Sequence, residues 1–343
     1  MASYCGKKVD AIVVVLTLVA LNNVSYMLAA RETSTGGLAK EAMKARHEMW
    51  MAEYGRTYKD EAEKAQRFKV FKVNADFIDK SNAAGNGKYL LGTNEFADMS
   101  HEEFMATYAR YKPIASGDKK LTGFKYVNVT LADIPDEIDW TKKGAVTKIK
   151  NQKECGCCWA FAAVATVESI HYIKTGQLLS LSEQQLLDCT GDKHNCKTGV
   201  TVSAFEYIIK NGGIATDDVY PYTAQKGKCN DHEVQLAVKI TSFEAVPRNN
   251  EDALAAAVAN QPVAVNMDAS KFQHYSSGVM SGHDCGTAMT HAVAVVGYGL
   301  EDETKYWLLK NNWGEHWGEK GYMRLERGTG ACGIDKEPSY PVA

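Results

Sequence analysis

A cysteine, a histidine and an asparagine follow one another in this sequence in an order that suits hydrolysis of peptide bonds by a thiol. Cys158 lies in residues 152–161, which read Q-K-E-C-G-C-C-W-A-F, and His291 and Asn311 follow at separations of 133 and 20 residues. A free cysteine has a pKa of about 8.5 and is mostly protonated at acid or neutral pH, so it needs activation. We expect His291 to hold the thiol proton and later to donate it to the leaving amine. We expect Asn311 to accept a hydrogen bond from the other ring nitrogen and so to fix the orientation of the ring.

Two helices are predicted near the cysteine. Residues 158–174 are apolar on almost all sides, which indicates a buried helix. Lys174 lies in its last turn and Gly176 just beyond, as is typical where a helix stops. Cys158 would open this helix, where the positive end of the helix dipole favours a thiolate. A second helix is predicted over residues 180–189, with Ser182 as its cap.

The chain turns to strands after about residue 244. Four short runs rich in Val, Ala, Tyr and Leu are bounded by turn residues, and they cover residues 262–267, 291–298, 306–310 and 321–325. Helices followed by strands predict an α+β enzyme of two lobes with a cleft between them.

Two further segments complete a resemblance to the papain-like cysteine endopeptidases over nearly the whole chain. Residues 289–298 read M-T-H-A-V-A-V-V-G-Y and residues 310–314 read K-N-N-W-G. Members of this family carry a C-G-[SA]-C-[WY] signature with His and Asn roughly 130–150 residues downstream. The resemblance implies a papain-like fold with a helical lobe at about 144–243 and a β-rich lobe at about 244–343. It also implies that Gln152 and the Cys158 backbone N–H form the oxyanion hole, and that Trp313 covers the contact between His291 and Asn311.

The resemblance also implies where substrate binds. The backbone of Gly199 would pair with the substrate backbone, and Trp313 is expected among the substrate-binding residues. The positions that match the pocket for the P2 side chain are Val200, Thr201, Asn266, Met289, Ala292 and Glu337. Because Glu337 would accept an arginine through a charge-assisted pair, we expect the pocket to tolerate both hydrophobic and basic P2 residues.

Several positions depart from the family pattern. Cys157 stands where Ser or Ala is usual, and the G-C-C-W version resembles that of plant senescence-associated members. Thr290 replaces the Asp that precedes the histidine in papain, Asn312 replaces a Ser, and Thr198 replaces a Gly in the loop 196–199. The remaining histidines are expected at the surface with no role, including His274, His283 and His316.

The region before the peptidase resembles the inhibitory prosegment of cathepsin L-like zymogens. Its helix pattern E-x3-R-x3-F-x2-N-x3-I-x3-N places six residues on one face, namely Glu63, Arg67, Phe71, Asn74, Ile78 and Asn82. A companion motif comprises Gly92, Asn94, Phe96 and Asp98. The alternative is an ordinary amphipathic helix that packs on its own domain. The resemblance implies an inhibitory propeptide over 31–132, with its core at about 46–103, that lies backwards through the cleft. Ion pairs of Glu63, Arg67 and Asp98 would act as an acid trigger when the carboxylates protonate.

The N-terminus predicts entry into the secretory pathway. Lys7 and Lys8 precede an apolar run over 11–21 that is too short to span a bilayer, which is typical of a signal peptide over residues 1–30. An N-terminal core helix is the alternative. The mature peptidase is expected over 133–343, beginning near Asp133 or Ile134, and Asn128 begins a glycan acceptor sequence N-V-T. A vacuole is favoured over the extracellular space.

Nine cysteines occur, and Cys5 would leave with the signal peptide. The family resemblance implies the disulfides Cys155–Cys196, Cys189–Cys229 and Cys285–Cys332, which leaves Cys157 and Cys158 unpaired. The C-x-x-C at 155–158 would also suit a redox dithiol or half of a zinc site. A redox dithiol needs a thioredoxin-like βαβ context and a zinc site needs a second ligand pair, and the sequence offers neither. We therefore expect no metal and no cofactor.

The composition is that of an ordinary globular protein. The chain has 343 residues, 45% hydrophobic and 24% charged, and a net charge of −3. It has no basic cluster that would indicate nucleic-acid binding. The partners that we expect for a monomeric enzyme are protein and peptide substrates, its own propeptide and cystatin-type inhibitors, with no membrane. A catalytically inactive homologue, an exopeptidase and a disulfide-rich structural protein are the alternatives. The resemblance favours a zymogen of an endopeptidase for general protein degradation, including in senescence.

Overall fold

The structure is a computed structural model that describes residues 38–85, 88–111 and 123–343. The signal peptide predicted over residues 1–30 lies outside the described residues, as does Cys5. The chain forms two units, residues 1–72 and 73–343.

In the first unit an aromatic cluster joins two helical segments. One helix covers residues 38–53, and the second is the first part of α2 (Glu61–Ala83). The ring of Phe71 lies 4.9 Å from that of His47 and 5.2 Å from that of Trp50, and all three side chains are buried. The Glu63 carboxylate accepts the backbone N–H of Lys59 at 2.9 Å. The six positions of the predicted helix motif all lie in α2.

In the second unit the asparagines of the prosegment motif tie the end of α2 to the chain that follows it. The side-chain amide of Asn74 donates to the carbonyl oxygens of Ala97 and Met99 at 2.9 and 2.8 Å. Asn82 exchanges two hydrogen bonds with the backbone of Leu91 at 2.9 and 3.0 Å, at the end of the short strand β1 (Tyr89–Leu91). The helix α3 (His101–Thr107) begins with a capping box formed by Ser100 and Glu103. These backbone contacts explain why asparagine suits the two motif positions.

The helical lobe is built around α4 (Cys158–Thr175), in which every residue from Cys158 to Ile170 is buried. The helix ends where the sequence predicts, because Gly176 adopts the left-handed conformation at φ 75°. The helix α5 (Glu183–Cys189) begins after Ser182, whose hydroxyl caps the N–H of Gln185 at 2.9 Å. The helix predicted over 180–189 therefore starts three residues later than expected. The helix α6 (Thr201–Asn211) packs against α4. Short 3-10 helices in the described residues are η1 (Leu131–Asp133), η2 (Asp231–Glu233) and η3 (Ala331–Gly333).

The β-rich lobe contains a mostly antiparallel sheet in the order β1-β5-β8-β7-β6-β4-β9-β3, with β2 paired to β6. The four predicted strands correspond to β4, β6, β7 and β8, of which β6 runs three residues further than predicted. The strands after β1 are β2 (Ile138–Asp139), β3 (Ser242–Ala245), β4 (Val263–Met267), β5 (Tyr275–Met280), β6 (His291–Glu301), β7 (Thr304–Lys310), β8 (Tyr322–Glu326) and β9 (Ser339–Val342). The first strand belongs to the N-terminal region, so this region adds an edge strand to the sheet of the lobe.

A helix interrupts the part of the chain that was predicted to consist of strands. The helix α7 (Glu251–Asn260) begins at Asn250, whose side chain accepts the N–H of Ala253 at 2.9 Å. The capping asparagine and the alanine-rich run that follows it are helix signals in the sequence. This helix was not predicted from the sequence, and none of the four predicted strands falls within it.

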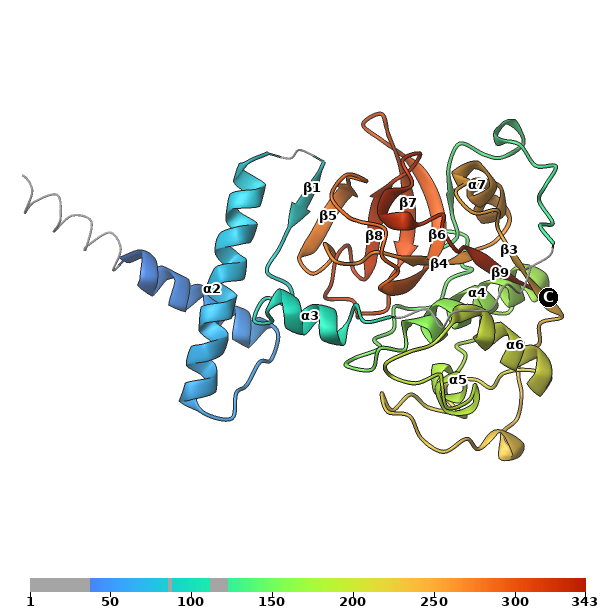
Figure 1. The fold of residues 1–343 in the computed structure, drawn as a ribbon, viewed down its shortest axis with the longest axis horizontal. Helices are drawn as coiled ribbons and strands as arrows, with labels where there is room; N and C mark the ends of the chain where they lie inside the picture. Colours follow the sequence, from blue (N-terminus) through green and yellow to red (C-terminus); the bar gives the residue numbers. More distant parts are fainter. Residues whose placement is uncertain (1–37, 86–87, 112–122) are drawn as a thin grey trace, which may run out of the picture. The chain divides into compact units, whose positions relative to one another are not determined.

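Each lobe has its own hydrophobic core, and the two lobes can be followed in Figure 1, where α4, α5 and α6 group together beside the strands β4 to β8. The core of the β-rich lobe includes Trp307, Trp313 and Trp317, and that of the helical lobe includes Trp159 and Phe205. The observed fold is papain-like and of the α+β class. No helix within the described ranges is long and apolar enough to cross a membrane.

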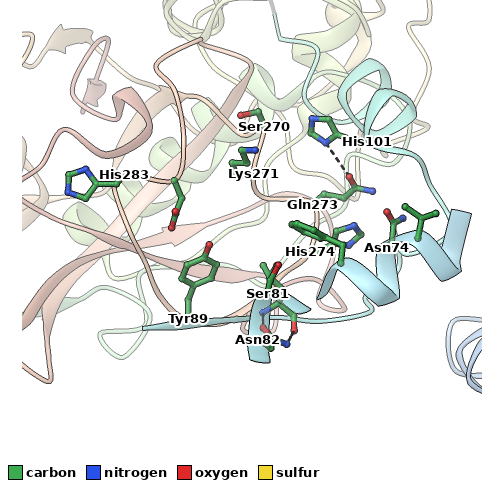
Figure 2. Close-up of a pocket in the computed structure, with 14 residues that line it drawn as sticks. Asn74, Ser81, Asn82, Tyr89, His101, Ser270, Lys271, Gln273, His274 and His283 are labelled. Carbon is green, nitrogen blue, oxygen red and sulfur yellow. Dashed lines mark hydrogen bonds between the residues drawn. The ribbon is translucent and has the colours of Figure 1, made fainter. Parts of the chain in front are cut away.

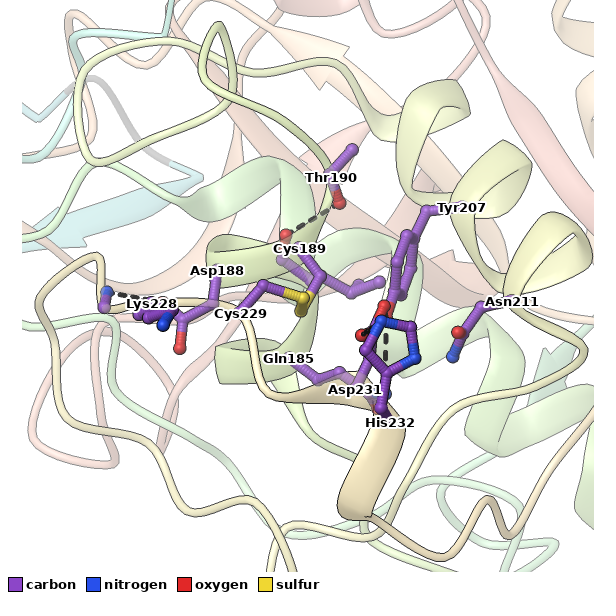
Figure 3. The surroundings of a disulfide bond; sticks show 12 residues. Gln185, Asp188, Cys189, Thr190, Tyr207, Asn211, Lys228, Cys229, Asp231 and His232 are labelled. Carbon is purple, nitrogen blue, oxygen red and sulfur yellow. Dashed lines mark hydrogen bonds and ion pairs between the residues drawn. A yellow bond between two sulfur atoms is a disulfide. The ribbon is translucent and has the colours of Figure 1, made fainter.

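The structure contains the three disulfides that the resemblance implied, Cys155–Cys196, Cys189–Cys229 and Cys285–Cys332, and it leaves Cys157 and Cys158 as buried free thiols. Figure 3 shows that Cys189–Cys229 joins the end of α5 to the segment that carries Asp231. Asp231 lies close to this pair, but the two sulfurs are bonded to each other and are not available as metal ligands.

Candidate active site

Three segments distant in the sequence bring the predicted catalytic residues together. Cys158 is the first residue of α4, His291 is the first residue of β6, and Asn311 directly follows β7. Cys158 packs in the same buried cluster as Ala292, the residue that follows His291. All three side chains are buried. The site therefore combines the start of a helix in one lobe with the ends of two strands in the other.

The histidine ring is held in one orientation. The Nε2–H of His291 donates to Oδ1 of Asn311 at 2.8 Å, and the same oxygen accepts the backbone N–H of Asn312 at 2.9 Å. The ring of Trp313 lies 4.5 Å from the imidazole at an interplanar angle of 31°. Nδ1 has no hydrogen-bond partner among the described residues. In the neutral ring the proton is on Nε2, which leaves the lone pair of Nδ1 to accept a proton.

Burial opposes separation of charge in this covered site. It raises the pKa of the Cys158 thiol to about 12, although the N–H groups of Ala292 and Trp159 and the charge of Arg110 act in the opposite direction. Burial also lowers the pKa of His291 to about 4, against the hydrogen bond to Asn311. The thiolate–imidazolium pair expected from the sequence is therefore disfavoured in this buried site.

Gln152 presents a buried and unpaired side-chain amide. Its backbone N–H donates to the carbonyl oxygen of Asn312 at 2.8 Å, whereas its side-chain Nε2 has no partner within the described part of the chain. A buried amide without a partner costs roughly 1–3 kcal/mol, which is expected where a donor is reserved for a ligand. The Gln152 carbonyl oxygen accepts the Tyr222 hydroxyl at 2.7 Å.

The two adjacent cysteines lie in different surroundings. The Cys157 sulfur is 3.0 Å from the Tyr222 hydroxyl, which in turn donates to Gln152. Burial raises the pKa of the Cys157 thiol well above its usual range. Through Tyr222, the Cys157 side chain supports the segment that carries Gln152, which is expected in the oxyanion hole. The cysteine that departs from the family pattern thus has a structural explanation.

The other departures also make specific contacts. The Asn312 side-chain amide donates to the carbonyl oxygen of Ala292 at 3.0 Å, so this residue joins the His291 strand to the Gln152 segment. The Thr290 hydroxyl accepts the N–H of Ala269 at 2.9 Å. The Thr198 hydroxyl donates to the carbonyl oxygen of Lys193 at 2.6 Å and closes its loop. Gly199 packs so tightly that a Cβ there would lie 2.1 Å from Nε1 of Trp159.

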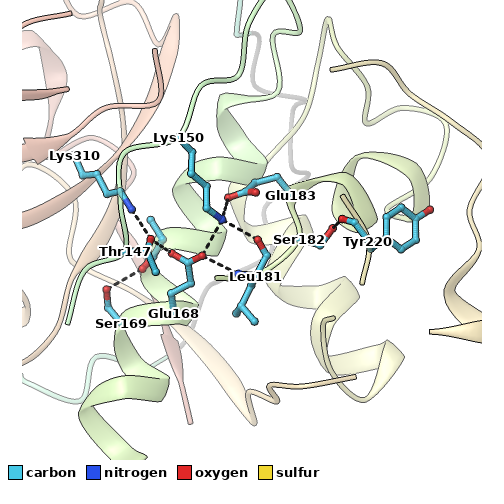
Figure 4. A network of polar contacts seen from close by, with 10 residues as sticks. Thr147, Lys150, Glu168, Ser169, Leu181, Ser182, Glu183, Tyr220 and Lys310 are labelled. Carbon is cyan, nitrogen blue, oxygen red and sulfur yellow. Dashed lines mark hydrogen bonds and ion pairs between the residues drawn. The ribbon is translucent and has the colours of Figure 1, made fainter. Parts of the chain in front are cut away.

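Figure 4 shows a buried charge network around Glu168. Lys150 binds Glu168 at 2.9 Å and Glu183 at 2.8 Å, while Thr147 donates to Glu168 at 2.6 Å and accepts from Lys310 at 2.8 Å. Burial works against the Glu168 carboxylate, but the two lysines outweigh it and lower its pKa. Lys310 directly precedes Asn311 in the sequence, and Lys150 lies two residues before Gln152. The network therefore fixes the two segments that carry these site residues.

The N-terminal region occupies the cleft. Phe104 of α3 packs edge-on against Trp313 with ring centroids 5.2 Å apart. Further along, Nη2 of Arg110 donates to the carbonyl oxygen of Glu154 at 3.1 Å, and the N–H of Tyr111 donates to the carbonyl oxygen of Thr290 at 2.9 Å. The chain thus runs from the Trp313 side past Cys158 towards the predicted P2 pocket.

Four of the predicted P2 residues, namely Val200, Thr201, Asn266 and Glu337, line one cavity, together with Arg248. Met289 and Ala292 instead pack in the core cluster that contains Cys158. Glu337 has two partners in the structure, because Nη2 of Arg248 lies 3.2 Å from its Oε1 and Nδ2 of Asn266 lies 3.5 Å from its Oε2. Arg248 lies 89 residues from Glu337 in the sequence and was not predicted as a residue of this pocket.

The surface position expected for His274 was wrong. His274 has only 6% of its surface exposed, and it lines a cavity with α2, β1 and His101 (Figure 2). Its carbonyl oxygen accepts the N–H of Gly92 at 2.8 Å, so the N-terminal region covers it. Burial, and secondarily the nearby His101, lower the pKa of His274 to about 4. His283 and His316 are exposed as expected.

Comparison with known families decides the identity. The model of the papain family cysteine proteases matches residues 134–342, and that of the cathepsin propeptide inhibitor domain matches residues 47–104. The chain belongs to the papain family of cysteine proteases. It is a cysteine endopeptidase in its proform, and the N-terminal region that fills the cleft contains its propeptide.

The chain is similar to plant enzymes over nearly its whole length. The chain is 50% identical to the senescence-specific cysteine protease SAG39 of Oryza sativa subsp. indica, over 93% of this chain and 95% of that protein. It is 45% identical to fruit bromelain of Ananas comosus, over 88% and 87%. Among solved structures it is similar to a recombinant stem bromelain precursor, with a TM-score of 0.81, 46% identity and coverage of 88% and 99%.

Proposed function

We propose that Cys158, His291, Asn311 and Gln152 carry out the peptide hydrolysis of this protease. The observation that carries the proposal is the hydrogen bond from Nε2 of His291 to Asn311, which leaves Nδ1 unpaired. Ala292, the next residue, packs in the cluster that contains Cys158. This arrangement gives a nucleophile, a base and a group that orients the base.

In the first step Nδ1 takes the proton of Cys158 and the sulfur attacks the carbonyl carbon of the scissile bond. The oxyanion of the tetrahedral intermediate would be stabilised by the backbone N–H of Cys158, at the start of α4, and by the unpaired Nε2 of Gln152. The imidazolium then protonates the leaving amine, and an acyl-enzyme remains. In the second step His291 takes a proton from water, which attacks the thioester and frees Cys158.

Asn311 and Trp313 keep the ring in position through this cycle. Asn311 orients the imidazole without adding a negative charge beside it, and the Trp313 ring covers the ring face at 4.5 Å. Substrate would pair with the backbone of Gly199 and place its P2 side chain in the cavity lined by Val200 and Asn266, with Met289 and Ala292 behind it.

The proform is held inactive in two ways. The segment around Tyr111 occupies the cleft, and burial keeps Cys158 and His291 neutral. When the propeptide departs, water and substrate reach the site, and a thiolate–imidazolium pair becomes favourable. The acid trigger expected from Glu63, Arg67 and Asp98 stays a prediction from the sequence.

The organisation of the chain that fits this function is a signal peptide over 1–30, a propeptide over 31–132 and a mature monomeric enzyme over 133–343. Asn128 is exposed and suits glycosylation in the secretory pathway. Similarity to senescence-specific cysteine proteases of plants supports a role in protein degradation, including in senescence. A vacuolar location and inhibition by cystatin-type proteins stay predictions from the family resemblance.

The test is acid activation of the purified proform followed by hydrolysis of a fluorogenic dipeptide. Cys158→Ala should abolish hydrolysis, whereas the matched change Cys157→Ala should retain it, because the Cys157 thiol contacts Tyr222 behind the site. Retention of activity in Cys158→Ala would overturn the assignment. A wild-type protein that folds and sheds its propeptide but does not hydrolyse any peptide would favour a catalytically inactive homologue.

A further inference from the structure

The carboxylate of Glu337 in the predicted P2 pocket is paired with the guanidinium of Arg248, which lines the same cavity. Glu337 pairs with Arg248 at 3.2 Å and lies 3.5 Å from the amide of Asn266, so both of its carboxylate oxygens have a partner. The remaining lining is largely apolar and includes Val200, Val202, Ala245, Val246 and Pro338. A substrate arginine that entered this cavity would meet one carboxylate and one guanidinium, rather than a free negative charge.

The propeptide supplies an occupant for this region of the cleft. Tyr111 is buried with 3% of its surface exposed, and it packs in the cluster that contains Cys158 and Ala292. Its backbone N–H donates to the carbonyl oxygen of Thr290 at 2.9 Å, directly before His291. Ala292 of the same cluster is paired with Asn266, which lines the cavity, in the pairing of β4 with β6.

We propose that Arg248 determines the specificity of this protease by pairing with Glu337, so that the P2 pocket selects uncharged, aromatic side chains and rejects arginine. Tyr111 binds there in the proform as an internal equivalent of such a P2 residue. The inference rests on the proposed function, since it assigns a substrate class to the same site. It replaces the expectation of a pocket that accepts basic residues.

The experiment compares substrates that share Arg at P1 and carry Phe, Tyr, Leu or Arg at P2, in the acid-activated wild type and in variants. The wild type should have a kcat/KM for Phe or Tyr more than about tenfold above that for Arg. Arg248→Ala and Arg248→Gln should raise the ratio of Arg to Phe by about fivefold, the size expected for one exposed ion pair. The double variant Arg248→Ala/Glu337→Gln should return the ratio towards the wild-type value.

A matched control removes a neighbouring positive charge that does not bind Glu337. Lys336 hydrogen-bonds Asn249 at 3.4 Å, so Lys336→Ala should leave the ratio unchanged. A wild type that cleaves Arg at P2 as well as Phe would overturn the proposal, as would an unchanged ratio in Arg248→Ala. An equal rise in Lys336→Ala would show a long-range charge effect instead. A complete lack of hydrolysis with every substrate would contradict the proposed function itself.

A second measurement does not depend on activity. In the proform with Cys158→Ser, Tyr111→Phe should retain the urea midpoint of unfolding and Tyr111→Arg should lower it. Adding Arg248→Ala should recover part of that loss, because a guanidinium at position 111 then has Glu337 available. If Tyr111→Arg lowers the urea midpoint equally with and without the Arg248→Ala change, Tyr111 does not bind in this pocket.

Discussion

Replacing His274 with glutamine should make the proform less sensitive to acid. His274 is buried beneath the N-terminal region, and its pKa is lowered to about 4. In an unfolded chain a histidine titrates near 6.5, so the unfolded state binds more protons than the folded state throughout the interval between these values. The folded proform is therefore favoured above about pH 6.5, and this contribution is lost as the pH falls towards 4.

The magnitude follows from the two pKa values. For a single group with a pKa of about 4 when folded and about 6.5 when unfolded, the free energy of unfolding decreases by about 2.5 kcal/mol between pH 8 and pH 4.5. The charged or titratable groups that line the same cavity are Tyr89, His101, Lys271, His283 and Asp284. Asp284 would favour the protonated ring, whereas Lys271 and His101 would oppose it.

The assay is urea unfolding of the proform at pH 8 and pH 4.5, with Cys158→Ser in every variant to prevent self-cleavage. His274→Gln should lose about 2.5 kcal/mol less than the parent between the two pH values. Each variant is compared with itself, so a general destabilisation by the substitution cancels. His232→Gln is the matched control, because the His232 side chain is 97% exposed. Equal losses in the parent and in His274→Gln would refute the reasoning.

Three further changes test other parts of the structure. Phe104→Ala should destabilise the proform by about 3–5 kcal/mol and shift its processing to higher pH, because it removes a fully buried ring from Trp313; Phe77→Ala, at a side chain that is 55% exposed, should cost far less in the same unfolding assay. Gln152→Ala should lower kcat by about 10²–10³ with little change in KM, since it removes an oxyanion donor, and a change confined to KM would contradict this role. Glu168→Ala should destabilise the fold by about 3–5 kcal/mol in urea unfolding at pH 7, because Lys150 and Lys310 lose their shared partner. Since the pKa of Glu168 is lowered, its contribution is present above pH 4.5, and the deficit should shrink only as the pH falls through the lowered pKa; a deficit that is unchanged there would contradict a charge effect.

The elements that position the site follow local rules, and these were predictable. The start of α4 at Cys158 and its end at Gly176 are set by a long apolar run and a left-handed glycine. Ser182 caps α5 through its own hydroxyl. The helix α7 also has local signals, in Asn250 and the alanines that follow, and it was missed because the neighbouring runs resemble strands.

The features that escaped the sequence depend on contacts between distant segments. His274 is buried because the chain at Gly92 pairs with its backbone, which no pattern around residue 274 indicates. The pairing of Arg248 with Glu337 joins the chain that follows β3 to the chain that precedes β9, two paired strands far apart in the sequence, so the sequence identified the acid but not its partner. The pKa shifts of Cys158 and His291 likewise arise from burial in the folded chain, which no local pattern indicates.

The central claim is that Cys158, and not its neighbour Cys157, is the nucleophile. The most direct measurement is labelling of the acid-activated enzyme with a thiol-directed epoxide, followed by peptide mapping and a parallel hydrolysis assay. We predict one label per molecule, at Cys158, with loss of hydrolysis in proportion to labelling. Modification at Cys157, or full activity after modification of Cys158, would contradict the account.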